Sequence, residues 1–250
     1  MSTAITCWGL HPVRALLRTA ADSILEAYSD AAVRSTELEQ LRAELGSHGV
    51  KVQLVPRQTL ERLAEGGRHQ GIVVRRRPLP PLSFDVLLDR LSASTTPALL
   101  LVLDGVQDPQ NLGSCLRVAD AAGCAAVIVP KDRSAGMSGA VVKAASGAAD
   151  TMPLVTVTNL SRALEALREA GVWTVGTTGE ASDALYDVDL TGSVAIVMGG
   201  EAKGIRQLTR DHCDYVVRIP MAGSVESLNV ATAAAICVYE AVRQRSAGKS

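Results

Sequence analysis

The chain has 250 residues, with 25 Lys+Arg against 26 Asp+Glu and a formal net charge of −1. At about 150 residues per domain, this length fits one large domain or two small ones. A composition with 47% hydrophobic and 20% charged residues excludes intrinsic disorder. Only 3% of the residues are aromatic, which argues against an RNA-binding sheet that stacks bases on several rings. The near-zero net charge also argues against a nucleic-acid partner, unless it averages over two differently charged parts.

The termini and the cysteines favour a cytoplasmic protein. No apolar run reaches the ~18 residues of a membrane span, and the first residues lack the basic start and apolar stretch of a signal peptide. The cysteines form no CxxC pair, so we expect neither a disulfide framework nor a metal site. The expected state is a set of small buried thiols, at Cys7, Cys115, Cys124, Cys213 and Cys237.

The first 78 residues are predicted to form a small α/β unit. Apolar residues between Val13 and Leu25 recur at helical spacing, and a second helix is predicted over 36–46. Residues 50–55 alternate like a half-buried strand, a short helix is predicted near 57–64, and an apolar run at 72–74 leads into three arginines. Three prolines within 78–81 cannot continue a helix or a central strand. We therefore predict a front domain over 1–78, a linker and first helix over 79–97, and a second domain over 98–250.

Beyond the prolines, short apolar runs alternate with helical stretches. Strands are predicted at 99–103, 125–129, 172–175 and 194–198, and helices near 111–122, 138–147, 158–170 and 226–244. Strands that are apolar on both faces belong to parallel sheets covered by helices. This pattern predicts a doubly wound α/β domain whose ligand lies at the carboxyl ends of the strands. The last helix is apolar around most of its circumference, which favours contact with a partner subunit.

Three loops carry unusual polar residues. The first places Asn111 at a helix start, where it could be an ordinary N-cap, and Arg117 further along among apolar neighbours. In the second, two glycines precede Glu201 and permit a ligand to approach closely. The third, over 219–229, holds more polar residues than capping the last helix requires. No GxGxxG follows the strand at 99–103, which argues against a nicotinamide-dependent dehydrogenase.

In order and spacing, these loops resemble the three motifs of the SpoU/TrmH group of SPOUT methyltransferases. The match runs over 104–117, 197–206 and 218–229. The front domain, with Trp8-Gly9-Leu10-His11-Pro12-Val13 and His69-Gln70-Gly71, is similar to the substrate-binding domain of bacterial 23S rRNA guanosine 2′-O-methyltransferases. The resemblance implies an L30e-like α/β front domain and a parallel-sheet SPOUT domain with a deep trefoil knot. It also implies S-adenosylmethionine bound in the knot, 23S rRNA as partner, and a homodimer packed through the knot and the last helix.

The resemblance also assigns roles to individual residues. Its catalytic and substrate-binding positions fall on Asn111, Arg117, Glu201, Ser227 and Asn229. Its cofactor-lining positions fall on Thr177, Gly199, Gly200, Ile219, Met221 and Leu228. Because an arginine resists deprotonation, our hypothesis is that Glu201 and Asn111 orient Arg117, which binds a phosphate or stabilises the developing alkoxide. Position 226 departs from the pattern, since it is Glu where a small polar residue is expected.

Two other members of the same class stay open at this point. A tRNA guanosine 2′-O-methyltransferase usually lacks a folded front domain, and a non-catalytic rRNA-binding factor would not need all five catalytic residue types.

The distribution of charge favours RNA binding by the front domain. Residues 1–78 hold 11 Lys+Arg against 8 Asp+Glu, a net charge of +3, whereas residues 79–250 hold 14 against 18, a net charge of −4. The candidate RNA-binding residues are His69, Gln70, Arg75 and Arg76.

Overall fold

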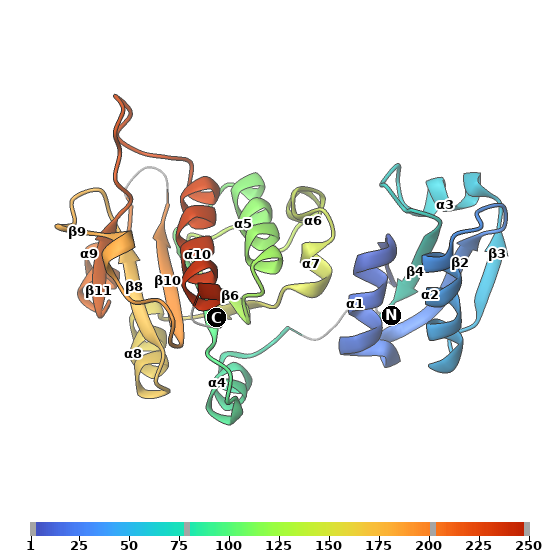
Figure 1. Ribbon diagram of the computed structural model, residues 1–250, viewed down its shortest axis with the longest axis horizontal. Helices are drawn as coiled ribbons and strands as arrows, with labels where there is room; N and C mark the ends of the chain where they lie inside the picture. The colour runs from blue at the N-terminus through green and yellow to red at the C-terminus, as the bar shows by residue number, and fades with distance from the viewer. Residues whose placement is uncertain (1–3, 78–80, 201–203, 248–250) are drawn as a thin grey trace. The chain divides into compact units, whose positions relative to one another are not determined.

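The structure, a computed structural model, describes residues 4–77, 81–200 and 204–247. The chain divides into two compact units, Met1–Pro80 and Pro81–Ser250, which Figure 1 shows with their helices and strands labelled. Each unit has its own sheet and its own hydrophobic core.

The first unit is built on a four-stranded sheet with the order β1-β4-β2-β3. Its strands are β1 (Ile5–Trp8), β2 (Ile24–Asp30), β3 (Val52–Val55) and β4 (Ile72–Arg76). Strand β4 is antiparallel to both β1 and β2, and β3 is parallel to β2. The helices are α1 (Leu10–Ala20), α2 (Thr36–Ser47) and α3 (Arg57–Leu63).

Two apolar clusters fix the helices on opposite faces of this sheet. Leu16 and Leu41, from α1 and α2, share one cluster with Ile72 and Val74 of β4. Leu60 of α3 packs on Val73, the residue between them, on the other face. Successive residues of a strand point to opposite faces, so β4 contributes to both clusters and is buried in the middle of the unit.

The predicted helices at 36–46 and 57–64 and the strand at 72–74 are confirmed to within two residues. The helix predicted to continue to Leu25 is wrong, because α1 ends at Ala20 and a 3₁₀ turn, Ala21–Ser23, leads into β2. Ile24 continues the helical spacing only by coincidence, since it is buried as the first residue of a strand. Strands β1 and β2 were not predicted from the sequence.

The second unit contains a seven-stranded sheet with the order β7-β6-β5-β10-β8-β11-β9, paired in parallel throughout. The strands are β5 (Leu99–Asp104), β6 (Ala126–Pro130), β7 (Leu154–Val157), β8 (Trp173–Thr177), β9 (Asp183–Ala184), β10 (Val194–Gly199) and β11 (Tyr215–Arg218). The helices are α4 (Phe84–Ala93), α5 (Pro109–Ala121), α6 (Gly139–Ala145), α7 (Ala148–Thr151), α8 (Leu160–Glu169), α9 (Gln207–Asp211) and α10 (Val230–Ala247).

Helices cover both faces of this sheet, as the continuous apolar runs predict. Leu101 and Leu103 of β5 join a cluster with residues of α5, α6 and α10, whereas Leu100 and Val102 join a second cluster with residues of α4 and α8. Figure 1 shows α5 and α10 next to each other on the first of these faces. The doubly wound architecture is therefore confirmed, although the short strands β7 and β9 were not predicted.

Within the described part of the chain, no helix is long and apolar enough to cross a lipid bilayer.

Candidate active site

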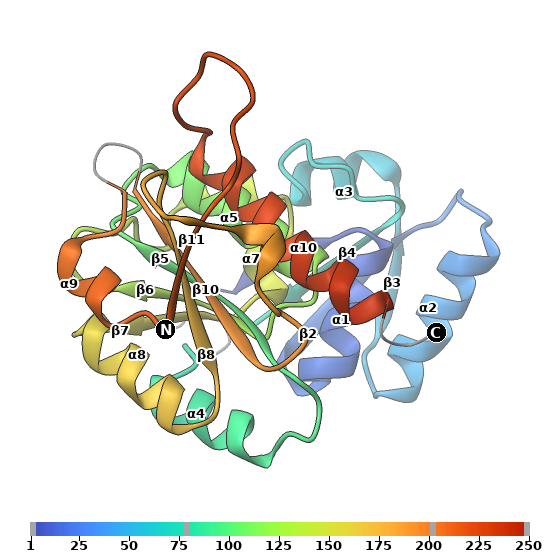
Figure 2. The ribbon, with the colours of Figure 1, turned by 60° about the vertical axis from the view of Figure 1, so that its left-hand side comes forward.

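The carboxyl ends of four neighbouring parallel strands bring the three sequence motifs to one edge of the second sheet. Gly199, the last residue of β10, is in register with Asp104, the last residue of β5. On the other side of β10, β8 ends at Thr177, which is in register with Val217 of β11. The loop after β11 extends outward from this edge before the chain enters α10 (Figure 2). Motifs separated by up to about a hundred residues thus converge where a doubly wound sheet binds its ligand.

At this edge Asn111 and Asn229 contact each other directly. Asn229 Nδ2 donates a hydrogen bond to Asn111 Oδ1 at 2.9 Å, and Asn229 Oδ1 accepts one from the backbone N–H of Ala231 at 2.9 Å, which caps α10. The last helix therefore begins at Val230 and not near 226. The N-cap of α5 is Asp108, whose Oδ1 accepts from the N–H of Asn111 at 2.9 Å. The alternative that Asn111 is an ordinary N-cap is wrong, because Asp108 occupies that position.

An ion pair with a buried carboxylate, which we did not predict, lies beneath this edge. The Asp104 carboxylate is fully buried and Arg206 is partly exposed. Arg206 contacts Oδ1 through Nε at 2.7 Å and through Nη2 at 2.5 Å, and its backbone N–H donates to Oδ2 at 3.0 Å. The sequence does hold a signal for this pair, since Asp104 ends an otherwise apolar strand that is buried on both faces. A carboxylate in such a place needs a partner, but the sequence does not say that the partner lies 102 residues away.

The two glycines at the end of β10, Gly199 and Gly200, are required by close packing of the protein's own backbone. A Cβ on Gly199 would lie 1.9 Å from the carbonyl carbon of Gly204, and a Cβ on Gly200 would lie 2.5 Å from the carbonyl oxygen of Gly105. The backbone N–H of Gly200 donates to the backbone carbonyl of Asp104 at 3.0 Å, and the N–H of Gly204 donates to the carbonyl of Gly200 at 2.9 Å. Close backbone packing thus explains both glycines without a ligand. Glu201, the predicted catalytic residue that follows them, lies outside the described residues.

The residues predicted to line the cofactor offer one hydroxyl and several apolar surfaces. Thr177 Oγ1 donates to the carbonyl oxygen of Val197 at 3.2 Å, which fixes the end of β8 against β10. Ile219 is half-buried against the core, Leu228 is half-buried, and Met221 is exposed. These groups suit a ligand that has both an apolar ring and polar edges, as S-adenosylmethionine does.

Arg117 lies on the same helix as Asn111, but among the described residues no hydrogen bond joins the two side chains. Six residues of α-helix place it about 9 Å further along α5. Its neighbours Leu116 and Ala119 face the core, whereas Arg117 is exposed. The interpretation that Arg117 has an apolar setting is therefore wrong. Ser227, in the loop before α10, is exposed as well.

The residues predicted to bind RNA in the front domain differ in their environments. His69 is buried, with Nδ1 accepting a hydrogen bond from the N–H of Gly71 at 3.1 Å, whereas Gln70 is exposed. Arg75 pairs with Glu26 at 3.0 Å. Arg76 is only 3% exposed, which weighs against the expectation that it contacts an RNA phosphate.

Comparisons with known proteins agree with this geometry. Residues 98–239 match the model of the SpoU rRNA Methylase family, and residues 7–82 match that of the RNA 2′-O ribose methyltransferase substrate-binding domain. A 23S rRNA (guanosine-2′-O-)-methyltransferase RlmB from Vibrio vulnificus is 52% identical over 97% of this chain and 98% of its own length. The RlmB of Escherichia coli K12 is 50% identical over 96% of this chain and 98% of its own length.

A solved structure gives the same result for the fold. The SpoU methyltransferase AviRb from Streptomyces viridochromogenes, crystallised with the cofactor AdoMet, superposes with a TM-score of 0.68 at 27% identity, covering 97% of this chain and 90% of AviRb. Together, the two matched models extend over most of the chain in the order that its two units follow. The sequence-based prediction is thereby confirmed, and the chain belongs to the SpoU rRNA methylase family.

Proposed function

We propose that the chain is an S-adenosylmethionine-dependent enzyme that methylates the ribose 2′-hydroxyl of a guanosine in 23S rRNA. The observation that carries the proposal is the meeting of Asn111 and Asn229 at the carboxyl edge of the sheet, since the resemblance assigns catalytic roles to both residues. The identity of about half of all residues to RlmB proteins, over nearly the whole chain, supports the choice of 23S rRNA over tRNA.

The cofactor would be held at the ends of β8, β10 and β11. Thr177, Ile219 and Met221 supply the hydroxyl and apolar groups described above. When bound, S-adenosylmethionine supplies an electrophilic methyl group. The task of the protein is then to hold the ribose oxygen in line with that methyl, and positioning of this kind contributes much of the acceleration of a two-substrate reaction.

The polar residues at the edge would position the ribose and stabilise its oxygen. The Asn111–Asn229 pair brings two side-chain amides together, and amides can both donate to and accept from a ribose hydroxyl. Arg117 is exposed and permanently charged, so it binds the RNA phosphate or stabilises the negative charge that develops on the oxygen. The hydroxyl proton leaves to water or to a phosphate, because a guanidinium has no acceptor for it. The proposal retains Glu201 as the residue that orients Arg117, and Ser227 as a ribose contact.

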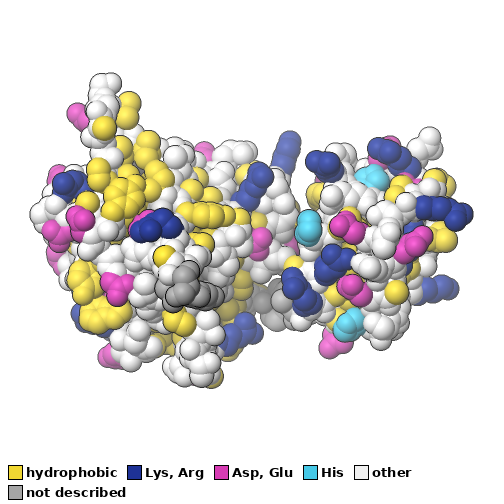
Figure 3. All heavy atoms as spheres, viewed as in Figure 1, with side chains coloured by type: hydrophobic (Ala, Val, Ile, Leu, Met, Phe, Trp, Pro, Cys, Tyr) yellow, Lys and Arg dark blue, Asp and Glu magenta, His cyan; other side chains and the backbone are white. Residues whose placement is uncertain are grey.

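The proposal includes a homodimer, the trefoil knot and a cytoplasmic location. Apolar side chains gather over the loop after β11 and over α10, as Figure 3 shows, and Met221, Val225 and Tyr239 are exposed there. A second copy of the chain that covers this surface would remove it from water. Sedimentation equilibrium would give the mass of a dimer, and a monomer at micromolar concentration would contradict this part of the proposal.

Methyl transfer to rRNA tests the function directly. The purified protein, tritiated S-adenosylmethionine and 23S rRNA from a strain lacking the gene should give transfer to one guanosine, mapped as a 2′-O-methyl group. Bulk tRNA should accept no methyl. Transfer to tRNA alone would support the tRNA methyltransferase instead, and cofactor binding without any transfer would support a non-catalytic RNA-binding factor.

A further inference from the structure

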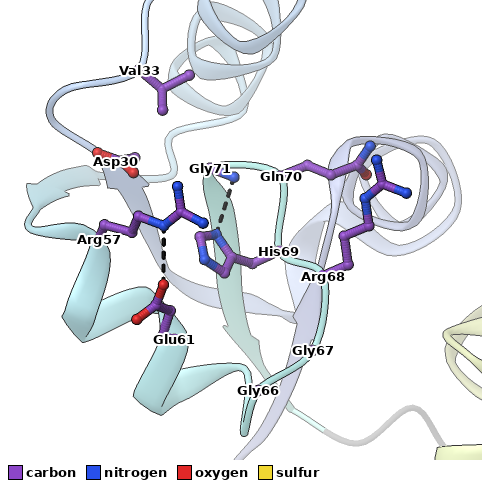
Figure 4. Close-up of a pocket in the computed structure, with 10 residues that line it drawn as sticks. All are labelled: Asp30, Val33, Arg57, Glu61, Gly66, Gly67, Arg68, His69, Gln70 and Gly71. Carbon is purple, nitrogen blue, oxygen red and sulfur yellow. Dashed lines mark hydrogen bonds and ion pairs between the residues drawn. The ribbon is translucent and has the colours of Figure 1, made fainter.

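A pocket in the front domain has no role in the chemistry described above. It has a volume of about 520 Å³, within the usual range of ligand sites, and is formed by residues around α3 and by the loop that precedes β4. Figure 4 shows its side chains, with the imidazole of His69 directed toward Arg57 and Glu61, and with Arg68 and Gln70 extending from the other side of the loop. The lining residues are Asp30, Val33, Arg57, Glu61, Gly66, Gly67, Arg68, His69, Gln70 and Gly71.

Arg57 has an exposed side chain that is oriented by one hydrogen bond. Glu61, one helical turn further along α3, accepts a hydrogen bond from Arg57 Nε at 3.0 Å. Among the described residues, none accepts a hydrogen bond from the two Nη groups of Arg57. A guanidinium whose amino pair has no acceptor within the protein is a donor arrangement that matches two neighbouring acceptors on one base.

His69 adds a second directed donor. Its Nδ1 accepts a hydrogen bond from the N–H of Gly71 at 3.1 Å, so the proton of the neutral ring is on Nε2. The backbone that holds it is unusual, since Gln70 has a φ of 51° and Gly71 a φ of 84°. A residue other than glycine rarely adopts a positive φ, and such strained positions cluster at binding sites. The turn directs His69 into the pocket, and Gln70 Oε1 accepts a hydrogen bond from the N–H of Leu10 at 3.3 Å.

We propose that this pocket binds an unpaired guanine of the RNA substrate, at a nucleotide other than the one that is methylated. The inference rests on the proposed function. Guanine presents O6 and N7 side by side, the acceptor pair that an arginine binds through two hydrogen bonds. Asp30 lies at the pocket wall, where its Oδ1 accepts from the N–H of Ala32 at 2.9 Å, so Oδ2 is the acceptor left for the N–H groups of the base. Sequence-specific recognition of RNA uses splayed-out bases of this kind, and a domain with few aromatic residues relies on arginine planes and edge contacts to hold them.

Substitutions of two arginines on the same helix test the proposal in the full chain. Arg57→Ala should raise the KM for unmodified 23S rRNA at least about fivefold while kcat at saturating RNA is unchanged, since one base contact is lost. Arg62→Ala, an exposed arginine of α3 outside the pocket, should leave KM unchanged. Arg57→Lys should behave like Arg57→Ala, because a lysine keeps the charge but loses the paired donors. A KM for Arg57→Ala equal to that of Arg62→Ala would overturn the proposal, as would full rescue by lysine, which indicates a phosphate contact.

Mononucleotides probe the pocket without any RNA or turnover. In an ¹⁵N-labelled full-length protein, millimolar 5′-GMP should shift the amide signals of Gly66, Gly67 and Gly71, and 5′-CMP should shift them less. Equal shifts with both nucleotides would show that the pocket binds the phosphate and not the base. No shift with either nucleotide would show that the pocket binds neither. If the wild-type protein methylates no rRNA, the proposed function fails. If it methylates rRNA but Arg57→Ala is silent, only the pocket proposal fails.

Discussion

The side chains of Asn111 and Asn229, 118 residues apart in the chain, meet through one hydrogen bond of 2.9 Å. Asn229 uses its other side-chain atom to cap α10, so one residue links the start of the last helix to the first motif. The catalytic edge and the packing of α10 therefore depend on each other.

Asn229→Asp separates these two roles. The aspartate keeps the oxygen that caps α10 but loses the donor to Asn111, so we expect near wild-type stability and at least a tenfold lower kcat. Asn229→Ala loses both roles, and the free energy of unfolding should fall by about 1 kcal/mol in addition. Asn159→Ala, which removes the cap of α8, is the matched control and should lower stability by a similar amount without changing kcat. Unchanged kcat in Asn229→Asp would contradict a role for the amide pair.

Arg117→Ala tests charge stabilisation at the 2′-oxygen. Because Arg117 is exposed, its removal should change the free energy of unfolding by less than about 0.5 kcal/mol. We expect kcat to fall at least a hundredfold while the Kd for S-adenosylmethionine, measured by calorimetry, stays within twofold. Arg162→Ala, an exposed arginine on α8, is the control. Near wild-type turnover in Arg117→Ala would show that the residue is not catalytic.

The Asp104–Arg206 pair predicts that substituting Arg206 lowers the free energy of unfolding more than substituting Asp104 does. Arg206→Ala leaves the fully buried Asp104 carboxylate without its charged partner, and we expect a loss of about 3 kcal/mol in the free energy of unfolding. Asp104→Asn removes the buried charge and leaves a partly exposed arginine that water can solvate, so its loss should be smaller. Arg210→Ala breaks a more exposed ion pair with Glu180 and should lose less than about 1 kcal/mol. Urea unfolding measures all three, and equal losses at positions 104 and 206 would contradict the asymmetry.

The buried thiols predict a loss of stability at alkaline pH. Burial raises the pKa values of Cys124, Cys213 and Cys237 from an ordinary 9.0 to about 12. These thiols stay protonated in the folded protein but ionise in the unfolded chain above pH 9, so the free energy of unfolding should fall as the pH rises from about 9 toward 12. Cys213→Ala should show a shallower fall between pH 8 and 10.5 in urea titrations. The same slope in both proteins would show that Cys213 does not contribute.

The modest charge of the front domain predicts a shallow salt dependence of RNA binding. Its net charge of +3 allows few phosphate contacts, and Arg76, one of its candidate cations, is buried. Titrations of 23S rRNA at several salt concentrations give the number of phosphates neutralised from the slope of the logarithm of the affinity. A slope that corresponds to about ten or more phosphates would contradict this prediction.

The architecture of the second unit and the family could both be predicted from residue patterns along the chain. Runs such as Leu99–Leu103 and Val194–Met198 are apolar at every position, which only a parallel sheet covered on both faces accommodates. Because parallel strands end at one edge, the motifs after them were expected to converge. Local patterns gave the helices of the front domain well, but missed β1 and misread Ile24, since one apolar residue fits a helix or a strand equally.

Which polar groups contact each other depends on the tertiary structure and could not be predicted from the sequence. The pairing of Asp104 with Arg206 and of Asn111 with Asn229 depends on strand order and register across more than a hundred residues. Three adjacent arginines look alike in the sequence, yet Arg76 is buried while Arg75 pairs with Glu26. The pocket around Arg57 and His69 likewise needs a helix and a distant loop to come together. Hydrophobic periodicity is local and can be read along the chain, whereas the partner of a charged side chain is set by non-local packing.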